Sequence, residues 1–140
     1  MEKLIFDSGI KEYQLGDCGI LRFNPADPNV YARFMDAVDN IQKIEDDLIK
    51  KGNELKEDGT SVLKLMEDVD GQIKEELNRV FGAGNDFNQI MCGVNLMAVA
   101  TNGERVVTNL LNALTPIMKS GAEACAKDEV AKAKAKHNAK

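Results

Sequence analysis

Nucleophilic catalysis is the first chemistry to test, because the chain contains three cysteines. A thiol or hydroxyl nucleophile needs a nearby base, and histidine is the usual one. The only histidine, His137, lies in a lysine-rich segment near the end of the chain, so we interpret it as inert. Cys92, beside Gly93, then lacks a base, and we predict a buried structural cysteine. The sequence offers no catalytic residue, and we expect a protein that is not an enzyme.

Two glycine-containing stretches could bind a metal ion or a nucleotide, but both lack the residue types that such sites need. Asp68–Gly71 looks like part of a calcium loop, yet Met66 and Leu77 would occupy two positions that require oxygen ligands. Gly82–Phe87 resembles half of a dinucleotide fingerprint, yet it follows a helical pattern rather than a strand. We therefore predict no metal site and no cofactor.

Acidic pairs are plentiful, and carboxylates held in a cleft with shifted pKa values could act as general acids or bases. Their spacing places them on the polar faces of predicted helices, so we interpret them as solvated surface. These runs include Glu45–Asp47, Glu67–Asp68 and Glu75–Glu76.

The net charge is −5 over 140 residues, and it is unevenly distributed. Residues 119–140 contain six lysines and three acidic residues, so this end is basic and the remainder is acidic. An acidic body argues against nucleic acid as the main ligand. No apolar run approaches the ~18 residues that a membrane span needs, so we expect no membrane partner.

The cysteines Cys18, Cys92 and Cys125 are odd in number and widely spaced. This usage is typical of free thiols in a reducing compartment. No apolar run follows a basic start, so we identify no signal peptide. We therefore expect a cytoplasmic protein.

Short apolar runs separated by turn residues open the chain and predict an antiparallel β-ribbon of two or three strands. The runs are Leu4–Phe6, Ile10–Leu15 and Ile20–Phe23. Two prolines in Asn24–Pro28 then end the ribbon, because each fixes the backbone. Asp27 is a good N-cap and Pro28 suits the first helical position, so a helix should begin there.

Two long amphipathic helices should follow and pair antiparallel. The first runs from about Pro28 to about Lys51, with apolar residues spaced alternately four and three apart as in a heptad seam. The second begins near Thr60 or Ser61 and ends at Gly82–Gly84, in the manner of a glycine cap.

Beyond the helical pair the predicted elements are shorter. Asn85 or Asp86 can cap a short helix, and residues 104–114 have helical periodicity. Pro116 should end or kink that helix.

The predicted fold class is α+β, mostly α, in a single domain over residues 1–140. It comprises an N-terminal antiparallel β-ribbon, a long antiparallel helical pair, shorter C-terminal helices and a basic tail that is partly disordered or a frayed helix. Their ranges are 1–24, 28–82, 85–118 and 119–140, respectively.

Apolar residues on the predicted helices could fill the core or line a groove for a partner helix. Methionine serves both purposes, since its side chain adapts to irregular surfaces. The sequence leaves both readings open. The candidate partner-binding positions are Phe34, Met35, Ile41, Met66, Met91 and Met97.

Four short stretches, in this order of elements, carry a family resemblance that covers nearly the whole chain in outline. They are the opening Leu4–Gly9 with Lys11-Glu12, the corner Arg22–Pro28, the helix end Arg79–Gly82, and Cys92–Ala98. The chain resembles the tail assembly chaperone-like proteins of bacteriophages and prophages of Gram-positive bacteria.

The resemblance implies a non-enzymatic role in phage morphogenesis, in the bacterial host cytoplasm. Such chaperones bind the apolar, helix-forming tape measure protein through amphipathic helices and keep it soluble until tail-tube subunits replace them. A protein partner and a possible homo-oligomer are therefore expected. The alternative is a structural subunit of a phage tail or head–tail connector that assembles through edge pairing of the β-ribbon.

Overall fold

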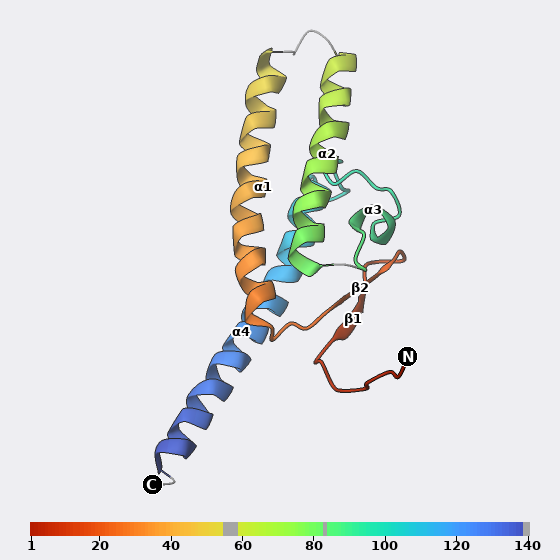
Figure 1. Cartoon of the computed structure of the whole chain (residues 1–140). Helices are drawn as coiled ribbons and strands as arrows, with labels where there is room; N and C mark the ends of the chain where they lie inside the picture. The colour runs from red at the N-terminus through yellow and green to blue at the C-terminus, as the bar shows by residue number, and fades with distance from the viewer. Residues whose placement is uncertain (55–58, 83, 139–140) are drawn as a thin grey trace.

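The computed structural model describes residues 1–54, 59–82 and 84–138. The elements in chain order are β1 (Lys11–Gln14), β2 (Ile20–Phe23), α1 (Pro28–Glu54), α2 (Gly59–Phe81), α3 (Phe87–Ile90) and α4 (Val106–Asn138). Figure 1 shows α1 and α2 side by side as an antiparallel hairpin, with α4 running behind it and the ribbon beside its base. The predicted fold class, mostly helical with an N-terminal antiparallel ribbon, is confirmed.

The corner between the ribbon and α1 forms as its residue types predict. Asp27 lies just before the helix, and its Oδ1 accepts a hydrogen bond from the backbone N–H of Asn29 at 2.9 Å. This bond satisfies one of the N–H groups that the first turn of a helix leaves without a partner. Pro28 supplies the first helical residue, where its missing N–H costs nothing.

The core lies where α1, α2 and α4 meet, and the heptad seam of α1 faces it. Phe34 and Ile41 of α1 and Ile73 and Leu77 of α2 are buried there. From α4, Met118 closes the base of this core. The stripes that the sequence shows on the two long helices therefore pack mainly on each other and on α4.

A row of aromatic rings joins the ribbon to the helices. Tyr13 of β1 stacks on Phe23 of β2, with ring centroids 5.1 Å apart. Phe23 contacts Phe81 at the end of α2 at 4.8 Å, and Phe81 stacks on Phe87 of α3 at 5.6 Å. A two-stranded ribbon is marginally stable alone in water, so this packing holds it in place.

The C-terminal region differs from the separate shorter helices that were predicted, because one helix spans residues 106–138. Of the two predicted effects of Pro116, ending the helix or kinking it, the first is wrong. Proline removes one helical hydrogen bond, but Leu114 and Met118 on either side are buried and hold the helix on the body. The Thr115 hydroxyl also donates to the Leu111 carbonyl at 2.7 Å. The predicted boundary at 118 is absent, and the predicted tail is a continuation of α4 that projects from the body (Figure 1).

The first apolar run, Leu4–Phe6, forms no strand in the structure, so the ribbon has two strands. Residues 1–8, which we name the N-terminal arm, are exposed along their whole length. The sequence pattern fits a strand, but the arm lacks a strand beside it to pair with.

Cys18 and Cys92 form a disulfide across 74 residues of sequence, with their Cα atoms 5.8 Å apart. The prediction of free thiols is therefore wrong for this pair, and Cys92 is exposed rather than buried. Gly19 brings the two segments together, because its N–H donates to the Ile90 carbonyl at 2.8 Å. Disulfides are typical of oxidising compartments, so the pair does not support the predicted cytoplasmic location.

Candidate protein-interaction surfaces

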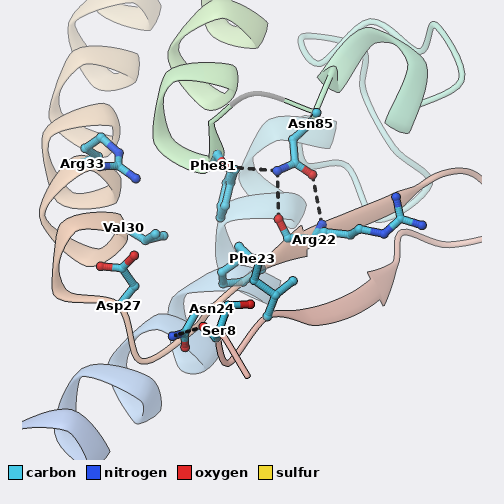
Figure 2. A pocket seen from close by; sticks show the side chains of 11 residues that line it. Ser8, Arg22, Phe23, Asn24, Asp27, Val30, Arg33, Phe81 and Asn85 are labelled. Carbon is cyan, nitrogen blue, oxygen red and sulfur yellow. Dashed lines mark hydrogen bonds between the residues drawn. The ribbon is translucent and has the colours of Figure 1, made fainter. Parts of the chain in front are cut away.

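The first hollow in the surface, named here the junction pocket, lies where the ribbon meets the start of α1 and the end of α2. Its volume is about 440 Å³, and Figure 2 shows the side chains that surround it. Asn85 closes one side. Its Oδ1 accepts from the Arg22 N–H at 3.0 Å, and its Nδ2 donates to the carbonyls of Arg22 and Phe81 at 2.8 and 3.1 Å. The amide thus fastens β2 to the end of α2.

The charged groups around the junction pocket also serve to join elements. Arg33 of α1 donates from Nε to the Val80 carbonyl at the end of α2, at 3.0 Å. Arg22 donates from Nε to a carboxylate oxygen of Glu12 on the neighbouring strand, at 3.0 Å. We interpret the pocket as a joint between elements, since these groups are committed to the protein's own backbone and side chains.

A buried ion pair within α2 also makes hydrogen bonds to α3 and to residues 94–97. Lys74 is 5 % exposed, and its Nζ lies 2.8 Å from Asp70 Oδ2 and 2.9 Å from Asn88 Oδ1. The other Asp70 oxygen accepts from the Leu96 N–H at 2.7 Å. All these polar atoms have partners, so the cluster is a structural network that holds α3 and residues 94–97 against α2.

The second hollow lies between α1 and α2 near the far end of the hairpin, and we name it the tip groove. It has a volume of about 260 Å³. Ile49 and Leu63 lie exposed at this end of the hairpin, at 59 % and 68 % of their surface. Figure 1 shows these turns of α1 and α2 standing above the rest of the molecule. The residues that line the groove are Leu48, Ile49, Gly52, Asn53, Val62, Met66 and Arg105.

Two charged residues of opposite sign interact at the tip groove, Arg105 in its lining and Glu45 on α1. Burial raises the pKa of the Glu45 carboxyl above its usual range, and the positive charge of Arg105 opposes that rise. Arg105 also donates from a terminal nitrogen to the Met97 carbonyl at 2.8 Å. The groove is thus mostly apolar, with a positive charge in its wall.

The third hollow lies between β1 and α4, and we name it the ribbon cavity. Its volume is about 590 Å³. Tyr13 and Lys11 of β1 form one side, the corner Pro25–Ala26 forms the base, and α4 forms the other side through Pro116, Ile117, Ser120, Gly121 and Ala124. The lining is mostly apolar, and Lys11 and Tyr13 place the cavity against the core-facing side of β1.

Three of the six predicted partner-binding residues lie in the core and are closed to a partner: Phe34, Ile41 and Met97. Met66 lines the tip groove, Met91 is half-buried against the core, and Met35 is exposed on α1. The structure therefore brings only Met66 into a groove. The exposed Leu63 was missed, because the apolar stripe of its helix passes through the neighbouring Val62.

Within residues 1–54, 59–82 and 84–138, no group of three or more histidine, cysteine, aspartate or glutamate side chains could hold a metal ion. In the same part of the chain, no helix has the length and apolar character that crossing a membrane requires.

Comparison of the chain with protein-family models, with curated proteins and with solved structures finds no match. The resemblance to tail assembly chaperones thus remains a prediction from the sequence, and the surfaces described above carry the functional argument.

Proposed function

We propose that this protein is a non-enzymatic phage morphogenesis protein that binds an apolar, helix-forming partner, in the manner of the tail assembly chaperones that it resembles. The tip groove is the observation that supports the proposal most directly. It presents Ile49, Val62 and Met66 between the antiparallel helices α1 and α2, and Leu63 lies exposed at the same end of the hairpin. A groove of this kind can receive one apolar face of a partner helix.

The surroundings of the tip groove suit an apolar, aggregation-prone partner that must stay soluble. The body of the chain is acidic, so each bound copy would add negative charge to a complex and oppose its association with other complexes. Met66 in the groove wall can adapt its shape to partner side chains of different size. Both features fit binding along a long apolar sequence rather than at one fixed residue.

The test is co-expression with a tape measure protein, the partner that the resemblance implies, followed by size-exclusion chromatography with light scattering. We expect co-elution and a soluble partner for the wild type, and an aggregated partner for the double variant Ile49→Glu and Leu63→Glu. The matched control is Val130→Glu, an exposed apolar position on the projecting part of α4. Absence of binding by the wild type, or unchanged binding by the double variant, would refute the proposal.

One observation favours the alternative role as a structural subunit. The outer edge of β1 is open, and an open strand edge is a ready site for pairing with another chain. A structural subunit should be present in purified virions, where a chaperone should be missing.

A further inference from the structure

We propose that the N-terminal arm of one copy of this chain docks in the ribbon cavity of a second copy, as a third strand along β1. The inference does not depend on the proposed function, because the contact lies between copies and uses neither Ile49 nor Leu63.

The N-terminal arm has the apolar composition of a β-strand, although it pairs with no strand in the part of the chain that the structure describes. Leu4, Ile5 and Phe6 are 85 %, 89 % and 78 % exposed, and they are consecutive. A run of large apolar side chains in water marks an interaction site more often than a free surface. In extended backbone, alternate side chains point to opposite faces, so Leu4 and Phe6 would share one face and Ile5 the other.

The outer edge of β1 has backbone groups free to receive a strand. Arg22 turns its N–H and carbonyl outward to Asn85, so it cannot use them to pair with Glu12, which lies opposite in the register. Glu12 and Arg22 thus form a non-hydrogen-bonded pair, in which the N–H and carbonyl of each residue point away from the other strand. Those of Glu12 therefore point to the open edge, and no hydrogen bond from the described part of the chain reaches them.

The ribbon cavity lies on the core-facing side of β1, next to the open edge. Tyr13 and Lys11 line it, and the register places them opposite Leu21 and Phe23, whose side chains are buried. A strand added beside β1 would extend this core-facing side of the sheet over the cavity. Leu4 and Phe6 could then enter it and pack on the wall that α4 provides.

The arm's own contacts favour a second copy over its own cavity as the acceptor. The Ser8 carbonyl accepts from Asn24 Nδ2 at 3.1 Å, and the Gly9 N–H donates to Asp7 Oδ1 at 2.8 Å. Gly9 lies so close to Asn24 that a Cβ on it would be 2.6 Å from the Asn24 amide nitrogen. Folding residues 4–6 back onto their own β1 would need a tight turn at these residues and would disturb these contacts, whereas an arm from a neighbour leaves them intact.

The test is complementation between two variants, measured by size-exclusion chromatography with light scattering over a range of concentrations. The arm variant carries Leu4→Ser and Phe6→Ser, and the cavity variant carries Ala124→Glu at an exposed position of the cavity wall. We expect the wild type to self-associate and each variant alone to do so at least about tenfold more weakly. A mixture of the two should recover a two-chain species, because an intact arm then meets an intact cavity.

Controls separate this contact from misfolding and from other surfaces. Circular dichroism melts should show that both variants fold, and Val130→Glu on α4 should associate like the wild type. A monomeric wild type would overturn the proposal, and hydrogen exchange at residues 4–6 would then show whether the arm closes on its own β1. Failure of the mixture to associate would overturn it as well.

Discussion

The side-chain amide of Asn85 pairs with both backbone groups of Arg22, accepting from its N–H at 3.0 Å and donating to its carbonyl at 2.8 Å. An adjacent strand would make the same two bonds. Asn85 therefore occupies the place of a third strand on the β2 side of the ribbon, and it ties that side to the last turn of α2 through Phe81.

Replacing Asn85 with alanine should reduce the free energy of unfolding by about 1–3 kcal/mol, because it leaves the backbone groups of Arg22 without partners at a largely buried position. Urea denaturation measures the change. Gln42→Ala is the control, since Gln42 makes its hydrogen bond to Asp46 on an exposed helix face and should change stability by less than about 0.5 kcal/mol. Equal effects of the two substitutions would contradict the strand-like role of Asn85.

Lys74→Met should destabilise the fold by about 3–5 kcal/mol, because it leaves Asp70 buried without its counter-charge. The pair Lys132 and Asp128 has the same spacing on α4 but lies exposed, so Lys132→Met should change stability by less than about 1 kcal/mol. The double variant Asp70→Asn and Lys74→Met should lose less than the sum of the single losses. Thermal and urea unfolding of Lys74→Met, Asp70→Asn, the double variant and Lys132→Met measure these differences in stability.

Helix α4 contacts the corner between the ribbon and α1 at Gly121. There is no space for a side chain at this position, since a Cβ there would lie 1.8 Å from the Pro25 carbonyl oxygen. Gly121→Ala should therefore cost about 1–3 kcal/mol as the helix and corner are forced apart. Gly71→Ala on α2 is the matched control, because a Cβ there meets no atom within 4 Å. That substitution should stabilise by up to about 1 kcal/mol, since alanine favours helix. A change in the free energy of unfolding of the same sign for both variants would contradict this close packing.

The raised pKa of Glu45, caused by burial, makes the folded state bind a proton more tightly than the unfolded state does. The contribution of Glu45 to the free energy of unfolding should therefore fall as pH rises from about 4.3, the ordinary glutamate pKa, through the raised value in the folded state. Glu45→Gln removes this ionisation, so the variant should become more stable relative to the wild type over that range. Urea melts of both proteins from pH 4 to 7 test this, and Glu54→Gln, at an exposed position, is the matched control.

The sequence predicts those elements that are determined by interactions between residues close together in the chain. Asp27 and Pro28 define the start of α1, and the four-and-three spacing of apolar residues defines the faces that α1 and α2 bury. The ribbon follows from its alternating runs and turn residues. In each case the deciding interaction lies within a few residues of the signal.

Features that depend on distant contacts could not be predicted in the same way. An apolar stripe shows which face of a helix is buried but not what covers it, so Phe34 and Ile41 were named as groove positions although they lie in the core. Pro116 is a strong local stop signal, and α4 continues past it because Leu114 and Met118 on either side are buried on the body. The disulfide of Cys18 depends on the approach of Gly19 to Ile90, which no spacing reveals.

The ribbon has two unlike sides, and this difference limits how far ribbons can stack edge to edge. A sheet with two open edges can add strands indefinitely, as fibrils do. Here Asn85 closes the β2 side, so only the β1 side can accept a strand. The ribbons of two copies could then pair only through their β1 strands, and the joined sheet would have a side closed by Asn85 at each end. Edge-to-edge stacking of ribbons therefore stops at two copies instead of propagating into a fibre.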